Sequence, residues 1–276
     1  MESFSADWLA LREPADHAAR SLGLTEELGV QLERRGVTRA IDIGCGTGSN
    51  VRYLLPRLPR VTDWTLVDHD AGLLDEAGRT LEPLARAQGV TLRTMRLDLA
   101  DLDALPLEPG ALITASALLD LVSAAWLGLF ADRCREVEAH VLAVLNYDGR
   151  IVWNPPHRDD SWIRGLVNTH QRTDKGFGPA LGPAAVGEAR ASFGDGETLV
   201  RSSAWRLAPD AAALQERLID GWADAARAIA PGEASRVDEW RRHRRDHIAA
   251  RRSSIVVGHL DLAVFPDVFR LTLETR

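Results

Sequence analysis

The chain has 276 residues, of which 45% are hydrophobic and 26% are charged, and its formal net charge at pH 7 is −7. This composition is that of a globular protein, and no apolar run approaches the roughly 20 residues that a membrane span needs. The negative charge disfavours an extended nucleic-acid surface, because such binding draws most of its affinity from neutralised phosphates. Two cysteines, Cys45 and Cys134, are too few for a disulfide framework and lack metal-ligand spacing, so we expect no metal site.

The beginning of the chain indicates a helical cap over residues 1–36. Residues 5–36 show two helical patterns, and the second ends at Gly36, just before the first expected strand. The first residues carry acids and no basic segment ahead of an apolar core, unlike a signal peptide. We therefore expect a cytoplasmic protein.

From residue 37 onward the hydrophobic pattern alternates between strands and helices, as in a doubly wound, mostly parallel sheet with helices on both faces. This core is expected to span residues 37–156. Its strands are predicted at 39–43, 64–68, 91–98, 111–116 and 140–146, and its helices at 48–58, 71–88 and 119–138. The Asp-Gly pair in YDGRIVWNPP, residues 147–156, indicates a hairpin that extends the sheet.

Residues 157–276 are expected to complete a single domain on the substrate side of the sheet. They contain a predicted helix from about Asp159, the loop TDKGFGPALGP, a helix over 184–193 and a strand over 197–208. A helical pair at 209–230 and 234–252 and a last strand at 253–265 follow. The sequence thus predicts an α/β fold with a seven-stranded sheet and a helical insertion before the last strand.

A glycine loop directly follows the first predicted strand, in the stretch AIDIGCGTGSN. In an open α/β sheet this turn is the usual ligand contact. The nicotinamide fingerprint would require a third glycine at position 49, where this chain has Ser49. The loop instead has the form D-x-G-x-G-x-G, made by Asp42, Gly44, Gly46 and Gly48. This form resembles motif I of the class I methyltransferases that use S-adenosylmethionine, whose ammonium and sulfonium suit a carboxylate neighbour such as Asp42.

Two further acids follow strands at the spacing of that family. Asp68 ends the second strand, where an acid can accept both ribose hydroxyls, although nicotinamide enzymes share this feature. The resemblance implies that Asp98 accepts the adenine amino group and that the backbone N–H of Leu99 meets the ring. The alternative is that both acids only cap helices or turns. The cofactor-binding residues implied by the resemblance are Asp42, Gly44, Cys45, Gly46, Asp68, His69, Asp98, Leu99 and Ser116.

The segment after the fourth strand, TASALLDLVSAAW, corresponds to motif IV of the family, which faces the methyl acceptor. There the resemblance implies that Ser116 lines the cofactor and that Asp120 or Trp126 reaches the substrate. The segment lacks the [DN]-P-P-[YF] signature of enzymes that methylate base amines or glutamine amides. A near match, NPPH, follows the fifth strand and has His157 in place of the aromatic residue, so we interpret it as a proline turn.

Methyl transfer from a sulfonium is an in-line displacement whose rate can come from alignment and exclusion of water, so a catalytic base is optional. His170 is the first candidate for a general base, because the unperturbed pKa of histidine is about 6.5, and Asp120 is the second catalytic candidate. Arg12 on the entry helix and Gln171 and Lys175 in the glycine-rich loop are the candidates for substrate binding. The alternative for the loop is a solvated surface segment.

The run WRRHRRDHIAARR, residues 240–252, is the one strongly basic segment. At helical spacing its basic residues spread around the cylinder, so we interpret it as a solvated helix balanced by preceding acids. The alternative is that it binds an anionic group of the substrate. The tryptophans of the late segments, Trp205, Trp222 and Trp240, are interpreted as packing residues.

The sequence therefore predicts a methyltransferase that uses S-adenosylmethionine to modify an oxygen or nitrogen nucleophile of a small molecule. Neither a membrane nor a nucleic acid is expected as a partner. One alternative is an rRNA or tRNA methyltransferase that uses the basic segment, and another is a non-catalytic cofactor-binding subunit. Nicotinamide oxidoreduction is disfavoured by Ser49 and Asp98.

Overall fold

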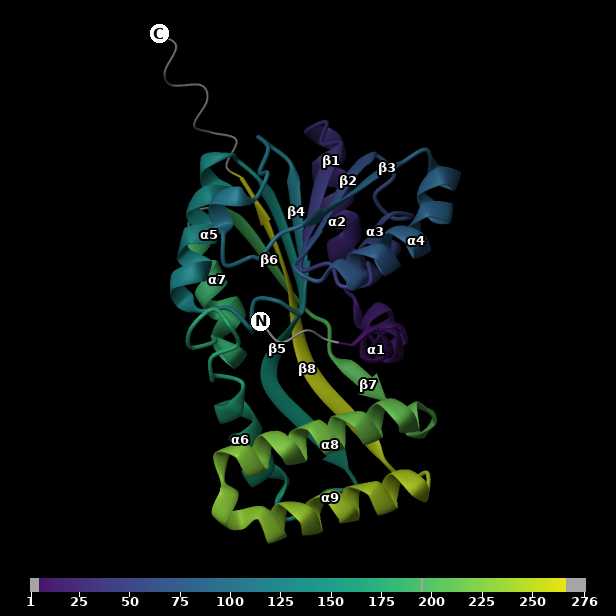
Figure 1. Ribbon diagram of the computed structural model, residues 1–276, viewed down its shortest axis with the longest axis vertical. Coiled ribbons are helices and arrows are strands. Elements are labelled where there is room, and N and C mark those ends of the chain that lie inside the picture. The colour runs from purple at the N-terminus through teal and green to yellow at the C-terminus, as the bar shows by residue number, and fades with distance from the viewer. Residues whose placement is uncertain (1–4, 195, 267–276) are drawn as a thin grey trace.

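The computed structural model describes residues 5–194 and 196–266. Its sheet contains five parallel strands, β1 (Arg39–Ile43), β2 (Asp63–Asp68), β3 (Thr91–Arg96), β4 (Leu112–Ser116) and β5 (His140–Asn154). A long strand β8 (Ser254–Phe265) runs antiparallel to β5, and β6 (Glu197–Ser202) and β7 (Trp205–Leu207) pair with it. The strand order is β3-β2-β1-β4-β5-β8-β6, with β7 beside β8 (Figure 1). The predicted doubly wound, mostly parallel sheet is confirmed.

The described part of the chain has eight strands, not the seven that the sequence predicted. The difference arises in the segment predicted as one strand over 197–208, which breaks at Ser203 and Ala204 into β6 and β7. At the break, the N–H of Ser203 donates to the carbonyl of His259 at 2.9 Å, so both short strands stay against β8.

The hairpin predicted at Asp148 and Gly149 is wrong, because β5 continues through these residues as one strand. The Asp148 carboxylate accepts the N–H of Arg150 at 2.8 Å, and Gly149 adopts a φ of +87°. The pairing register with β8 shifts between Tyr147 and Ile151. The Asp-Gly pair therefore makes a bulge that bends the strand and does not reverse it.

Nine α-helices and four short 3-10 helices connect the strands of the described residues. The α-helices are α1 (Ala6–Ala19), α2 (Leu22–Arg34), α3 (Ser49–Leu54), α4 (Ala71–Gln88), α5 (Ala124–Glu136), α6 (Asp160–His170), α7 (Ala185–Phe193), α8 (Ala212–Ile229) and α9 (Ala234–Ala249). The 3-10 helices are η1 (Leu102–Ala104), η2 (Gly182–Ala184), η3 (Pro209–Ala211) and η4 (Pro231–Glu233). No helix of the described residues is long and apolar enough to cross a membrane.

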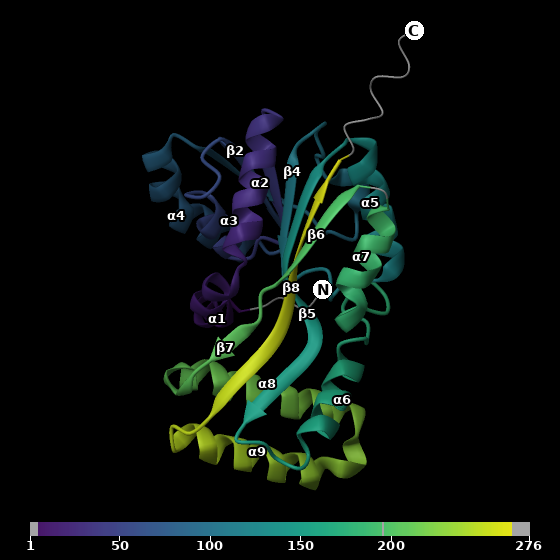
Figure 2. The same ribbon diagram turned by 180° about the vertical axis from the view of Figure 1, so that it is seen from behind.

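Two apolar cores hold the helices to the two faces of the core sheet. On one face, Ile41 and Ile43 of β1 share a cluster with residues of α5 and α7. On the other face, Trp64 and Leu66 of β2 pack with residues of α2, α3 and α4. Figures 1 and 2 show these two layers from opposite sides. The alternation of buried side chains along each strand thus serves both faces.

The strands β5 and β8 continue far beyond the core sheet (Figures 1 and 2). The pairing of β5 with β4 ends at Val144, whereas its pairing with β8 continues to Asn154. We call this extension, formed by residues 146–154 of β5, residues 254–260 of β8 and the short strand β7, the projecting sheet. A third apolar core, including Trp153 and Trp205, joins it to α6, α8 and α9.

Most of the basic segment falls on α9, where two of its exposed or half-buried arginines pair with a preceding acid. Arg241 lies 2.7 Å from Asp220 of α8, and Arg245 lies 3.3 Å from the same carboxylate. Arg244 differs from the prediction of a solvated helix, because it is buried and donates to the carbonyl of Pro155 at 2.6 Å. The prediction that tryptophans of the late segments are packing residues is confirmed by the burial of Trp205, Trp222 and Trp240.

Candidate functional site

The glycine loop lies at the edge of the sheet where the parallel strands β1 to β4 end, here called the carboxyl edge. Gly44, Gly46 and Gly48 all have positive φ, at +63°, +52° and +80°. A Cβ on Gly48 would lie 2.6 Å from Cδ1 of Leu81 in α4, and one on Gly46 would lie 2.9 Å from Cδ1 of Leu9 in α1. The loop is thus enclosed by two helices and requires glycine for both its conformation and its packing.

Asp42 is buried beneath this loop. Its Oδ1 accepts from Nδ2 of Asn50 and from Oγ1 of Thr114, each at 2.6 Å, whereas its Oδ2 has no hydrogen-bond partner among the described residues. Burial raises the pKa of Asp42 to about 6. The carboxylate therefore joins β1 to β4 and α3, and its predicted contact with the ammonium of a cofactor stays a prediction.

Asp68, the last residue of β2, holds the glycine loop from the other side. Its Oδ2 accepts the N–H of Gly46 at 2.9 Å, and its Oδ1 accepts the N–H of Asp70 at 3.0 Å. The imidazole of His69 lies 3.2 Å from the same Oδ1. The helix cap of α4 is Asp70, so Asp68 does not cap that helix, but the bond of its Oδ1 to the N–H of Asp70 is a turn contact, as the alternative expects for one oxygen. Each carboxylate oxygen offers two acceptor sites, so Asp68 keeps capacity for ribose hydroxyls.

Asp98 and Leu99 lie beyond β3, which ends two residues earlier than the sequence predicted. Asp98 is exposed, and its Oδ1 accepts the N–H of Ala100 at 3.0 Å, so a turn role holds for one oxygen. Leu99 is fully buried, and its carbonyl accepts the indole N–H of Trp126 at 2.6 Å. Cys45 is a buried free thiol within the loop, and Ser116 ends β4 half-buried.

Asp120 lies in the segment after β4, with 6% of its surface exposed. Its Oδ1 has no hydrogen-bond partner among the described residues. Burial raises the pKa of Asp120 to about 6, against the lowering effects of the Arg12 charge and the backbone N–H of Tyr147. The structure therefore brings together two residues that the sequence predicted separately, Asp120 and Arg12.

Arg12 projects from α1 onto the short strand β7. Its Nε and Nη2 lie 2.9 Å and 3.2 Å from the carboxylate oxygens of Asp16. Its guanidinium lies 5.1 Å from the ring centroid of Trp205, whose indole N–H donates to Asp16 at 3.1 Å. Arg12 is thus fixed by a carboxylate and an aromatic face, and its charge is offset by Asp16.

Tyr147 and His259 also lie at this place and were not predicted from the sequence. They are paired opposite each other in β5 and β8, and their ring centroids lie 6.4 Å apart. His259 is buried, its Nδ1 has no partner among the described residues, and its ring lies 5.0 Å from that of Trp205. Burial lowers the pKa of His259 to about 3, aided by the charge of Arg12. The sequence signal for this residue is a histidine in the mostly apolar run SIVVGHLDLAVF.

The other predicted catalytic and substrate residues lie at the end of α6 and in the following loop. His170 is the half-buried last residue of α6, Gln171 caps that helix, and Lys175 lies farther along. The loop then returns to the segment after β4, since the N–H of Gly182 donates to the carbonyl of Asp120 at 3.0 Å. This contact anchors the end of the loop, whereas Thr173, Asp174 and Gly176 are exposed, as the alternative of a solvated surface segment expects. The roles of His170, Gln171 and Lys175 stay predictions.

The NPPH near match lies at the far tip of the projecting sheet, away from the carboxyl edge. The peptide bond between Asn154 and Pro155 is cis, and the His157 ring lies 4.5 Å from that of His243 in α9. This agrees with the interpretation as a proline turn. Within the described residues, no group of histidine, cysteine and carboxylate side chains is suited to hold a metal ion.

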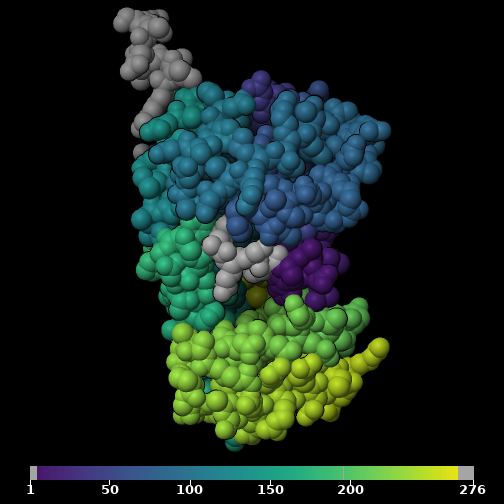
Figure 3. All heavy atoms as spheres, viewed as in Figure 1, coloured from purple at the N-terminus to yellow at the C-terminus, as the bar shows by residue number. Residues whose placement is uncertain are grey.

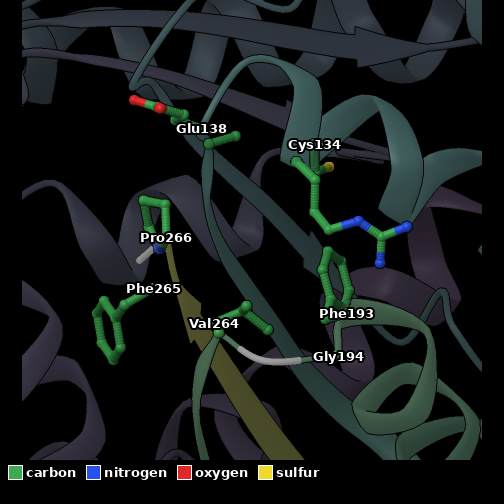
Figure 4. A pocket seen from close by; sticks show the side chains of 10 residues that line it. Cys134, Glu138, Phe193, Gly194, Val264, Phe265 and Pro266 are labelled. Carbon is green, nitrogen blue, oxygen red and sulfur yellow. The ribbon is translucent and has the colours of Figure 1, made fainter. Parts of the chain in front are cut away.

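A pocket of about 340 Å³ lies at the opposite end of the sheet, where β8 ends and β5 begins (Figure 4). Cys134 and Phe193 border it from α5 and α7, and Val264, Phe265 and Pro266 border it from the end of β8. Since the glycine loop, Asp68 and Asp120 all lie at the carboxyl edge, this pocket is not part of the candidate site.

The strand order, the antiparallel β8 and the glycine loop after β1 define the fold of class I methyltransferases. No protein-family model and no curated protein matches the chain. Among solved structures, a candidate methyltransferase from Bacillus halodurans is 11% identical with a TM-score of 0.50, covering 87% of this chain and 99% of that chain. The predicted resemblance is thereby confirmed at the level of the fold.

Two more solved structures are similar to this chain. The cyclopropane synthase MmaA2 from Mycobacterium tuberculosis is 14% identical with a TM-score of 0.48, covering 94% of each chain. The YcgJ protein from Bacillus subtilis is 15% identical with a TM-score of 0.47, covering 87% of this chain and 98% of that chain.

Proposed function

We propose that the protein is a methyltransferase that uses S-adenosylmethionine to modify an oxygen or nitrogen nucleophile of a small molecule. The observation that carries this proposal is the arrangement at the carboxyl edge. Asp68 is hydrogen-bonded to Gly46 of the glycine loop, and the buried carboxylate of Asp120 lies beyond the neighbouring strand β4. The residues proposed to bind the cofactor and the unsatisfied carboxylate of Asp120 thus lie at the same edge of the sheet. A group-transfer site requires such an arrangement, because donor and acceptor must meet.

The residues of the edge suit S-adenosylmethionine chemically. Asp68 offers acceptors for ribose hydroxyls, and the exposed carboxylate of Asp98 offers one for an adenine amino group. Ser49 stands where a nicotinamide fingerprint has its third glycine. When bound, S-adenosylmethionine supplies an electrophilic methyl group on a positively charged sulfur. The protein binds, orients and shields the reactants, and these effects account for much of the rate of an in-line displacement.

A small-molecule acceptor is favoured by the elements around Asp120. The loop anchored at Gly182 lies against this segment, and Asp120 is only 6% exposed. The RNA alternative is weakened by α9, where Arg241 and Arg245 pair with Asp220 of α8. A cytoplasmic location and the division of the chain at residues 36 and 156 stay predictions.

The test is calorimetric binding of S-adenosylmethionine and S-adenosylhomocysteine, with NADH and NADPH as controls. We expect micromolar affinity for the first pair and an affinity at least about tenfold lower in Asp68→Asn, because removing one charged hydrogen-bond acceptor typically forfeits about 1.5–3 kcal/mol. The exposed Asp75→Ala on α4 is the control and should bind like the wild type.

Three outcomes would contradict this proposal or favour one of the alternatives. Tight binding of a nicotinamide cofactor, or no binding of either pair by folded protein, would overturn the proposal. Binding of S-adenosylmethionine without turnover on any acceptor, but with turnover after a co-purifying protein is added, would support the non-catalytic subunit. RNA binding with a steep salt dependence would support the RNA alternative.

A further inference from the structure

Two buried polar side chains near the carboxyl edge lack partners. Asp120 and His259 are each 6% exposed, and neither Oδ1 of Asp120 nor Nδ1 of His259 has a hydrogen-bond partner among the described residues. A buried polar atom without a partner typically forfeits about 1–3 kcal/mol of stability. Two such atoms in one neighbourhood indicate that a ligand completes their hydrogen bonds.

The two side chains belong to one neighbourhood although they are far apart in the sequence. His259 is paired with Tyr147 across β5 and β8, and the backbone N–H of Tyr147 lies near enough to Asp120 to lower the pKa of that carboxyl. The positive charge of Arg12 lowers the pKa of both Asp120 and His259, so it lies near both side chains. In Figure 3 a hollow lies between α1 and α8, and the yellow of β8 is visible at its floor.

The charges of this neighbourhood restrict the ligand. Arg12 is paired with Asp16, and burial keeps His259 neutral by lowering its pKa to about 3. Asp120 forms no ion pair among the described residues, so ionised Asp120 is the uncompensated charge. An anionic ligand would meet like charge here, whereas an N–H or O–H donor would meet an open acceptor.

We propose that Asp120 and His259 bind the methyl acceptor beside the rings of Tyr147 and Trp205, and that the acceptor is a neutral or cationic small molecule with an N–H or O–H group. This inference rests on the proposed methyltransferase function. The ring centroid of Tyr147 lies 6.4 Å from that of His259, and the ring centroid of Trp205 lies 5.0 Å from it. These aromatic rings provide apolar faces that can also bind a cation.

Asp120 receives the proton in this scheme. The nitrogen or oxygen of the acceptor forms a bond to the methyl carbon while the carbon–sulfur bond breaks and its electron pair stays on sulfur. The proton of the acceptor then passes to the carboxylate of Asp120, which becomes a neutral carboxyl group. His259 orients the acceptor through a hydrogen bond, because a histidine with a pKa of about 3 is a poor base at neutral pH.

The first experiment uses probes that differ in charge. Tyramine and 4-hydroxyphenylacetate share a phenol ring and its O–H but carry an ammonium and a carboxylate, and tryptamine and indole-3-acetate form a second pair. These two pairs are titrated, together with a library of neutral and cationic amines, phenols and alcohols, into the full chain saturated with S-adenosylhomocysteine. We expect saturable binding by members of this library, and at least about tenfold weaker binding of each carboxylate counterpart.

The second experiment separates catalysis from binding. Asp120→Asn should keep its affinity for S-adenosylhomocysteine within twofold, lose at least 100-fold in turnover, and lose the rise of kcat/KM that the wild type shows as pH increases through about 6. His259→Gln should raise KM about tenfold with a smaller change in kcat. Asp210→Asn, at an exposed position in η3, is the matched control.

A third measurement needs no acceptor. His259→Phe keeps an aromatic ring and removes the unpartnered nitrogen, so its melting temperature should be equal to or above that of the wild type. A lower melting temperature would assign His259 a structural role and overturn its part in the site. Binding of S-adenosylhomocysteine with no saturable binding by any neutral or cationic probe would overturn this inference and leave the proposed function standing. Failure to bind S-adenosylhomocysteine would overturn both.

Discussion

The two halves of the proposed site differ in how the protein holds its polar groups. At the cofactor half, both oxygens of Asp68 accept backbone N–H groups and the glycine loop is enclosed by α1 and α4, so the unpartnered Oδ2 of Asp42 lies beneath a braced loop. At the acceptor half, Asp120 and His259 each keep a buried atom without a partner. We infer that the cofactor half is rigid and preformed, and that a ligand completes the hydrogen bonds of the acceptor half. Substitutions should therefore affect the two halves in opposite directions.

The largest effect is expected at the rigid half, in Gly48→Ala. The new Cβ would lie 2.6 Å from Cδ1 of Leu81, at a φ of +80°. Overpacking and an unfavourable backbone conformation together should lower the free energy of unfolding by about 2–5 kcal/mol. Urea denaturation measures this change. In the control Gly128→Ala, the new Cβ on α5 meets no atom within 4 Å, so stability should rise by about 0.5–1 kcal/mol. Equal stability of Gly48→Ala and wild type would contradict the idea of a rigid loop.

At the acceptor half, the substitution Asp120→Asn should raise the free energy of unfolding, by an amount that depends on pH. The pKa of Asp120 in the folded protein, about 6, lies above its ordinary value of 3.8, so folding favours the protonated form. The stability of the wild type relative to Asp120→Asn is therefore greatest below pH 4 and falls as pH rises through about 6. The loss should reach about 2–3 kcal/mol at pH 7. Urea denaturation of both proteins from pH 4 to pH 7 measures it, with Asp210→Asn as the control, and parallel curves would refute the expectation.

The sequence predicted the rigid half well, because its signals are local. The strand at 39–43 and the helix at 71–88 have the bounds that the hydrophobic pattern predicts, and the glycine spacing locates the loop. Even here the sequence did not predict that Asp42 is buried and bonded to Asn50 and Thr114. Its partner Thr114 is 72 residues away, and no local pattern indicates that contact.

The acceptor half was predicted only in part, because it is assembled from distant segments. Asp120 and Arg12 were both candidates, but their proximity depends on how α1 packs against β7. Tyr147 and His259 meet through the register of β5 and β8 between its two shifts, after Ala143 and just before the bulge at Asp148. That bulge was interpreted as a hairpin, so the length of β5 and its long pairing with β8 were missed. Sequence periodicity gives the type of an element but not its partners.

A smaller effect is expected for Thr114→Val, which tests how far Asp42 supports the cofactor half. The substitution removes the hydroxyl donor at 2.6 Å and leaves Asn50 as the side-chain partner of Asp42. We expect unfolding free energy to fall by about 1–3 kcal/mol, as for other buried groups that lose a partner. Thr65→Val, at a half-buried position in β2, is the control and should be neutral within about 0.5 kcal/mol. A neutral Thr114→Val would mean that Asp42 does not depend on this bond.

The smallest effect is expected at the contact between the two halves, in Trp126→Phe. The indole N–H of Trp126 donates to the carbonyl of Leu99 on the cofactor side, and its ring meets Phe177 edge-on at 5.7 Å, in the loop that returns to Asp120. Losing one hydrogen bond should lower the free energy of unfolding by about 1 kcal/mol. Trp64→Phe is the matched control, because Trp64 also donates to a backbone carbonyl, that of Val61. Both variants should lose similar stability, but only Trp126→Phe should speed amide hydrogen exchange in residues 173–182. Equal exchange in the two variants would mean that the halves are not linked through Trp126, and that contacts such as the bonds of Leu181 to Val122 and of Gly182 to Asp120 suffice to hold the loop.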